Sequence, residues 1–276
     1  MVVSNKIFKT QGEIKMIKKV ILLGRKPGAA KALKWLLQNG VMVSFVVVDP
    51  KEKSPLPTLK DTAEALGIQV YTEDETIYWM IQNGTKPLND IDLVISYLHN
   101  RKIRKPLFEL GAMGCINFHP APLPDYKSSA GYNMAIMEKR NSFGVSAHFI
   151  DSEKFDSGPI IKVKRFPINH SVETAISLEK KTQEKLFHLF TETMEDLMIT
   201  GGVTTSPNSE GLYLNRQQLE SLKVVDPEKD SSEEIHRKIR AFFFPPYHGA
   251  KIMINGEGFT LIDDETLKYL AWLIHQ

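Results

Sequence analysis

The sequence pattern is built around the segment Gly114-Cys115-Ile116-Asn117-Phe118-His119-Pro120-Ala121-Pro122-Leu123-Pro124. If its apolar half is a strand, Asn117 and His119 are two residues apart and share one face of that strand. The prolines that follow cannot continue a sheet, so the pair stands where a strand gives way to a loop. Asp156 comes later, in a turn bounded by Gly158. An amide, an imidazole and a carboxylate can together run an acyl transfer, because they stabilise an oxyanion, move a proton and orient the imidazole.

Four apolar runs precede this segment, and each is expected to form a strand. They cover residues 20–23, 41–48, 69–71 and 91–96. Stretches with helical character lie between or after them, at residues 29–38, 58–66, 76–82 and 106–110. Strands that are apolar throughout and alternate with helices favour a mostly parallel sheet covered on both faces. The sequence therefore predicts an α/β domain, in which residues 116–118 form the next strand.

Beyond the segment the pattern changes from alternation to a hairpin, a long helix and a tail. The expected elements are a helix at 132–138, an antiparallel strand pair at 145–149 and 160–166, a long helix at 172–198, a linker at 202–210, a tail helix at 232–243 and a hairpin through Asn255-Gly256. Three parts are predicted: a flexible extension at 1–15, a catalytic domain at 16–201 and a small C-terminal α+β appendage at 202–276. Met16 directly precedes the first strand, so it is an alternative start.

The composition is that of an ordinary globular protein and argues against several classes of function. Lys and Arg number 35 against 33 Asp and Glu, so the net charge of +2 gives no electrostatic case for a nucleic-acid partner. Cys115 stands alone, which excludes an internal disulfide, and the eight histidines show no metal-ligand spacing. No apolar run is long enough for a membrane span. We expect a cytoplasmic protein with neither a metal nor a membrane partner.

The three chemical elements also carry a family resemblance. The run Asn117-Phe118-His119-Pro120, then Leu123-Pro124, then Asp156-Ser157-Gly158 resembles the catalytic core of the folate-dependent formyltransferases. His119 and Asp156 are 156 − 119 = 37 residues apart, as in that family's pattern. The resemblance covers roughly residues 17–166 well. It implies a Rossmann-like formyltransferase fold and 10-formyltetrahydrofolate as the one-carbon donor, with Asn117, His119 and Asp156 as the catalytic residues.

The resemblance also implies where the two substrates bind. The folate is expected against one strand end, the Leu-Pro loop and the loop before Asp156, with contacts from Ser96, Tyr97, Leu98, Leu123, Phe149, Ile150, Asp151 and Lys154. The acceptor is expected against the following loop and helix and against the tail, with contacts from Lys127, Ser128, Tyr132, Asn133, Arg240, Phe244 and Tyr247. Arg240 would bind a diphosphate, and the tail aromatics would face a base.

The acceptor is predicted from departures within the family. Lys127-Ser128 stands where many members carry Arg-Gly, and Tyr132-Asn133 resembles the sugar-nucleotide N-formyltransferases, as does the tail at 239–246. A tail of about seventy residues near neutrality is smaller and less basic than that of the tRNA enzymes. The prediction is therefore formyl transfer to a nucleotide-linked amino sugar, a precursor of cell-surface glycans such as lipopolysaccharide O-antigen. The alternatives are a methionyl-tRNA or glycinamide ribonucleotide formyltransferase, a formyltetrahydrofolate hydrolase, and a catalytically silent binding protein.

Other candidates favour structural explanations. Gly24-Arg25-Lys26-Pro27-Gly28 lacks Gly-x-Gly-x-x-Gly spacing, so it predicts an ordinary strand–helix turn. Cys115 lies in an apolar strand, where a thiol is not activated, and core packing is expected. The run Phe242-Phe243-Phe244, with Tyr247, is too apolar for water. Three roles are open for this run: packing on the first domain, lining a pocket for a base, or joining two copies of the chain. We predict a homodimer.

Overall fold

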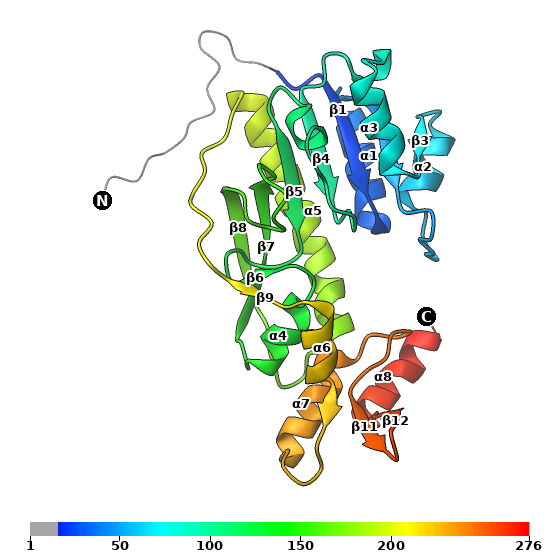
Figure 1. Ribbon diagram of the computed structural model, residues 1–276, viewed down its shortest axis with the longest axis vertical. Helices are drawn as coiled ribbons and strands as arrows, with labels where there is room; N and C mark the ends of the chain where they lie inside the picture. The colour runs from blue at the N-terminus through cyan, green and yellow to red at the C-terminus, as the bar shows by residue number, and fades with distance from the viewer. Residues whose placement is uncertain (1–15, 276) are drawn as a thin grey trace, which may run out of the picture.

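The computed structural model describes residues 16–275, and the predicted extension at 1–15 lies outside them. A seven-stranded sheet in the order β3-β2-β1-β4-β5-β7-β8 forms the centre of the molecule (Figure 1). Its strands are β1 (Lys19–Gly24), β2 (Met42–Val48), β3 (Val70–Tyr71), β4 (Leu93–Tyr97), β5 (Cys115–His119), β7 (Ser142–Phe149) and β8 (Ile160–Pro167). The first five are parallel, whereas β7 is antiparallel to β5 and β8 is antiparallel to β7. The predicted mostly parallel α/β sheet is confirmed.

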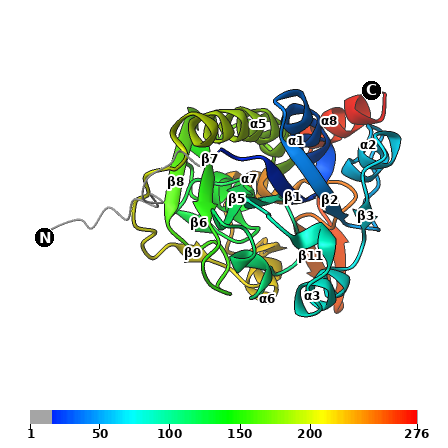
Figure 2. The ribbon, with the colours of Figure 1, turned by 90° about the horizontal axis from the view of Figure 1, so that it is seen from above.

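Helices cover both faces of this sheet, as Figure 2 shows for α1 and α5 on one side and α3 on the other. The helical elements of this part are α1 (Lys26–Gln38), α2 (Leu59–Ala65), α3 (Asp74–Gln82), α4 (Gly131–Met137) and α5 (Ala175–Thr200), with 3₁₀ turns η1 (Lys86–Leu88) and η2 (Leu107–Glu109). Strand β1 is apolar because both of its faces are covered. Val20 and Leu22 pack toward α1 and α5, while Ile21 and Leu23 pack toward α3 and η2.

The predicted elements in residues 16–200 are all present, with boundaries shifted by at most three residues. The long helix begins later than expected, because its N-cap is Thr174, which forms a capping box with Ser177. It ends at Gly201, whose φ of 67° is left-handed. The expected short helix at 106–110 is only the 3₁₀ turn η2.

The C-terminal part holds more structure than the sequence predicted. Its elements are β9 (Leu212–Tyr213), α6 (Arg216–Leu222), β10 (Val224–Val225), α7 (Ser232–Phe242), β11 (Lys251–Ile254), β12 (Glu257–Thr260) and α8 (Asp264–Ile274). The hairpin through Asn255-Gly256 and the helix α7 are confirmed, whereas α6 and α8 were not predicted. Phe242 and Phe243 are buried within the chain, the former against α4. This packing removes the aromatic run as an argument for a second copy.

The predicted linker at 202–210 is attached to the catalytic sheet. Ser206 forms a β-bridge with Ile160 at the start of β8. Further along the chain, β9 pairs in parallel with β6 (Tyr126–Lys127) in a separate two-stranded sheet. This segment therefore runs along the edge of the sheet, beside the loops that follow β5 and β7.

Candidate active site

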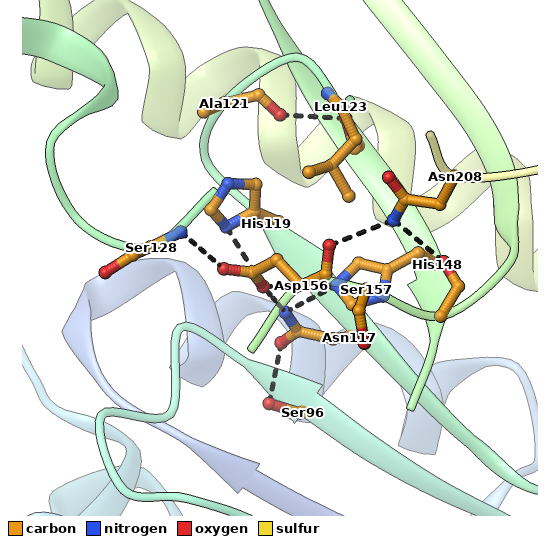
Figure 3. A network of polar contacts seen from close by, with 12 residues as sticks. Ser96, Asn117, His119, Ala121, Leu123, Ser128, His148, Asp156, Ser157 and Asn208 are labelled. Atoms are coloured by element: carbon orange, nitrogen blue, oxygen red, sulfur yellow. Dashed lines mark hydrogen bonds and ion pairs between the residues drawn. The ribbon is translucent and has the colours of Figure 1, made fainter. Parts of the chain in front are cut away.

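A cavity of about 310 Å³ lies at the carboxyl ends of the parallel strands β4 and β5. Its lining includes Asn117, His119 and Asp156, together with His148 from the antiparallel strand β7. The pairing register brings these side chains together. Asn117 lies opposite His148 on β7, and Ser96 on β4 lies beside Asn117 on the other side. The three predicted catalytic side chains thus converge at one point (Figure 3).

The side-chain amide of Asn117 is fixed by three neighbours. Ser96 Oγ donates to Asn117 Oδ1 at 2.8 Å. Asn117 Nδ2 lies 3.0 Å from His148 Nε2 and donates to Asp156 Oδ1 at 3.2 Å. His148 Nδ1 lies 2.8 Å from the Phe149 carbonyl, which can only accept, so Nδ1 carries a proton; Nε2, which also lies 3.3 Å from Asp156 Oδ1, is the nitrogen that can accept from Asn117. Both Nδ2 hydrogens therefore have protein partners, and an oxyanion would displace one of them.

His119 is enclosed, with 4% of its surface exposed. Its Nε2 lies 2.9 Å from the Tyr126 carbonyl and so carries a proton, while Nδ1 lies 3.5 Å from Asp156 Oδ1. Burial lowers the pKa of His119, Asp156 opposes that shift, and His148 adds to it. Asp156 thus favours the cation as expected, but burial outweighs it. The neutral imidazole has its free lone pair at Nδ1, where it can accept a proton.

Asp156 stays ionised although it is enclosed. Burial would raise the pKa of its carboxyl, but His119, His148 and the backbone N–H of Ser128 together hold it well below its usual value. Ser128 N donates to Asp156 Oδ2 at 2.8 Å. The Asp156 backbone has φ of 47°, a left-handed conformation that is unfavourable for Asp and must be stabilised by its surroundings.

The predicted folate contacts divide into two sets. Ser96, Leu98, Ile150 and Lys154 line the cavity. Tyr97, Leu123, Phe149 and Asp151 do not. Tyr97 is a correction, because it is fully buried against Phe118 and Phe190, and successive side chains of a strand point to opposite faces. Leu123 and Phe149 are likewise buried in the protein core, and Asp151 is exposed outside the cavity lining.

Of the predicted acceptor contacts, only Ser128 lines this cavity. Asn133 Nδ2 donates to the Ala241 carbonyl at 2.7 Å, which holds α4 to α7. Tyr132, on the same helix, is half-buried and packs against Phe143, and burial raises the pKa of its hydroxyl. Lys127 belongs to the short strand β6.

The predicted tail contacts lie elsewhere. Arg240 lines a separate cavity of about 620 Å³ between the start of α5, α7 and the start of α8. Phe244 lies 5.8 Å beneath the ammonium of Lys26, and Tyr247 is 70% exposed beside Phe244. In this arrangement the tail side chains are not part of the cavity that holds Asn117 and His119. The sequence could not show this, because the placement depends on how the C-terminal part packs.

Two residues that contact the catalytic group were missed. His148 is one of the histidines without metal-ligand spacing, and its signal in the sequence is a polar residue inside an apolar strand. Asn208 lies in the predicted linker, yet its side-chain amide donates to two carbonyls of the Asp156 turn. Cys115 is buried as predicted, and burial raises the pKa of its thiol.

Within residues 16–275, no three His, Cys, Asp or Glu side chains are placed to hold a metal ion. No helix in the same range is long and apolar enough to cross a membrane.

Comparison with known proteins identifies the family. Residues 18–194 match the family model described as formyl transferase, and this match spans more than half of the chain. The chain belongs to the formyl transferase family. The matched range contains the whole Asn117, His119 and Asp156 group and all strands of the large sheet. The predicted family and the predicted enzyme class, a one-carbon group transferase, are confirmed.

Individual relatives fall into two groups. The methionyl-tRNA formyltransferase of Kosmotoga olearia is 27% identical over 232 residues, which cover 81% of this chain and 73% of that protein. The GDP-perosamine N-formyltransferase of Brucella melitensis is 30% identical over 168 residues, covering 61% of this chain and 63% of that protein. The structure of an N-formyltransferase from Helicobacter canadensis, solved with folinic acid and dTDP-3-aminofucose, superposes with a TM-score of 0.68 at 25% identity. That likeness covers 87% of this chain and 85% of the Helicobacter chain.

Proposed function

We propose that this formyltransferase transfers the formyl group of 10-formyltetrahydrofolate to the amine of a nucleotide-linked amino sugar. The observation that carries the acceptor class is the superposition on the Helicobacter enzyme, which extends past the family domain into the C-terminal part. That enzyme was solved with a folate and a dTDP-linked amino sugar. The cavity lining suits a pterin, since apolar Leu98, Ile103 and Ile150 are combined with polar groups at one end.

Each of the three proposed catalytic residues has one role in the proposed reaction. The neutral acceptor amine attacks the formyl carbon, and one N–H of Asn117 turns from its protein partner to the developing oxyanion. One such donor contributes about 10²–10³ in rate. His119 takes the amine proton at Nδ1 and passes a proton to the leaving nitrogen of the folate, a role worth on the order of 10²–10⁴. Asp156 stabilises the imidazolium formed in between. The carbon–nitrogen bond to the folate breaks as the new amide bond forms.

The main alternative is formylation of methionyl-tRNA. It is favoured by the relatives, because the Kosmotoga enzyme aligns over most of this chain. Against it stand the formal net charge of +2 and the small C-terminal part, which offer little for counterion release from a tRNA backbone. We also propose that the protein is a cytoplasmic homodimer. It would supply formylated precursors for O-antigen or a similar surface glycan.

The deciding experiment is an acceptor panel. The enzyme would be incubated with 10-formyltetrahydrofolate and dTDP-, UDP- or GDP-linked amino sugars, and products scored by mass for the gain of one formyl group. Methionyl-tRNA, glycinamide ribonucleotide and water would be tested in parallel. At least one amino sugar should turn over, and His119→Ala should lose at least about 10² in turnover. Efficient transfer to methionyl-tRNA with no amino-sugar product would overturn the acceptor assignment.

A further inference from the structure

One segment outside the family domain contacts both loops that build the catalytic group. We call residues 206–213 the strap. Its first contact is a two-way backbone bridge: Ile160 N donates to Ser206 O at 2.9 Å, and Ser206 N donates to Ile160 O at 2.8 Å. The bridge fixes the strap to Ile160 of β8, which follows Asp156 by four residues.

The strap then holds the Asp156 turn directly. Asn208 Nδ2 donates to the carbonyl oxygens of Asp156 and Gly158, each at 2.9 Å (Figure 3). Both hydrogens of that amide are therefore used on one turn. The turn needs such support, because Asp156 has a left-handed φ of 47°. At Gly158 a Cβ would stand 1.9 Å from the Phe149 carbonyl, so the backbone is closely packed there as well.

Further along, the strap holds the second loop. Gly211 crosses the Leu-Pro loop so closely that a Cβ would meet the Pro124 carbonyl at 1.6 Å. Leu212 N donates to Asp125 O at 2.9 Å, and Leu212 pairs with Tyr126 in the small sheet. The Tyr126 carbonyl is the group that accepts from His119 Nε2. The strap thus contacts the loops that fix His119 on one side and Asp156 on the other.

We infer that the strap is a positioning element for the formyl-transfer site, and that Asn208 is the residue through which it sets the placement of Asp156 against His119. The inference rests on the catalytic roles proposed above. Asn208 touches no reacting atom, and acts through the turn that it bonds. A displacement of about 1 Å in a catalytic group can cost on the order of 10² in rate, so two bonds on this turn are enough to matter.

The variants Asn208→Ala and Asn208→Asp test this role. The first removes the amide, and the second keeps its shape but replaces both donors with a carboxylate that repels the two carbonyls. Each should lower kcat by about 10- to 10²-fold with a much smaller change in KM for either substrate, since most of the cavity lining lies outside this turn. Ser209→Ala is the matched control, because Ser209 is the exposed neighbour in the strap, and it should leave kcat unchanged.

A second readout does not depend on the acceptor. Burial and His148 lower the pKa of His119, whereas the nearby Asp156 raises it. The Tyr126 carbonyl contacts the other ring nitrogen of His119, Nε2. If the turn moves away, the His119 titration seen by NMR in the enzyme alone should shift to lower pH. A purely structural role for Asn208 would lower the melting temperature without moving this titration. Asn208→Ser, which keeps one donor, serves if the larger changes prevent folding, and it should show a smaller shift.

The outcomes separate the two proposals. Folded Asn208 variants with an unchanged His119 titration and unchanged kcat would overturn the positioning role. A shifted titration in an enzyme that formylates no nucleotide-linked amino sugar would overturn the acceptor assignment and leave the strap in place.

Discussion

At the scale of single residues, the site is prepared for proton acceptance and is only partly prepared for oxyanion binding. His119 is neutral because of burial, and its lone pair at Nδ1 faces the cavity beside an ionised Asp156. Asn117 has both amide hydrogens engaged, one on His148 and one on Asp156. An oxyanion must therefore compete with a carboxylate and an imidazole for the same donor. This competition favours the charged transition state over the neutral formyl group of the ground state.

The depressed pKa of His119 predicts the pH dependence. Turnover should fall as the pH drops through a midpoint below 6.5, the ordinary value for histidine, because protonated His119 can no longer accept the amine proton. Asp156→Asn removes the charge that raises this pKa, so the midpoint should move lower still. Measurement of kcat from pH 4.5 to 8 at saturating substrates checks both. A midpoint above 6.5 would contradict the burial argument.

The same residues set how stability responds to acid. The folded-state pKa of His119 is lower than in the unfolded chain, so its protonation costs stability once the pH falls below about 6.5. The pKa of Asp156 is also held low, and the stability it contributes is present above about 3.8 and lost as the pH falls below that value. Both effects destabilise the fold in the same direction.

At the scale of elements, the site is made where the sheet changes from parallel to antiparallel pairing. Strand β5 has the parallel β4 on one side and the antiparallel β7 on the other. Ser96 and His148 are therefore the two sheet neighbours of Asn117, and each bonds a different end of its amide. The chain leaves β7 one residue after His148, and the loop that follows carries Asp156 to the amide of Asn117.

This pairing predicts a role for His148. His148→Ala should lower kcat by about 10-fold or more, because the amide of Asn117 then loses one of the contacts that orient it. His188→Ala is the control, since His188 is exposed on α5 far along the chain from the site. Kinetics at saturating folate, with a melting curve for each variant, gives the comparison. Normal turnover in folded His148→Ala would show that Ser96 and Asp156 are sufficient to hold Asn117.

At the scale of the whole molecule, the C-terminal part joins the catalytic domain through extensive contacts. Helix α7 packs on α4, with Asn133 bonded to the Ala241 carbonyl, and the strap runs along the sheet edge. The outer surface is different, since several apolar side chains of the C-terminal hairpin and of α8 are about half exposed or more. These are Met253, Ile254, Phe259, Leu267 and Ile274.

These exposed side chains support the proposed homodimer better than the buried aromatic run does. Light scattering at micromolar concentration should give about twice the 31.3 kDa chain mass. Phe259→Glu should shift the protein toward the single-chain mass, while Leu56→Glu, an exposed apolar site on the catalytic domain, should not. A single-chain mass for the unaltered protein would reject the dimer.

How far the sequence predicts this molecule depends on the range of the interactions. Apolar periodicity is local, so it placed the strands and helices of residues 16–200 within three residues. The motif at 117–119 and Asp156 predicted a catalytic group from spacing along the chain, and the fold brings these three side chains together. The tail was predicted less completely, although α6 and α8 begin with capping boxes at Asn215 and Asp263.

The sequence by itself determined the α/β class and the family, and it predicted the three residues that are proposed to carry the chemistry. Only the tertiary structure decided that His148 and Asn208 hold them, that Tyr97 is in the core, and that Arg240 lines a different cavity. The reason is physical. A motif records which residue types stand near one another along the chain, whereas contacts between residues 31 or 52 positions apart are fixed by strand register and by how the C-terminal part packs.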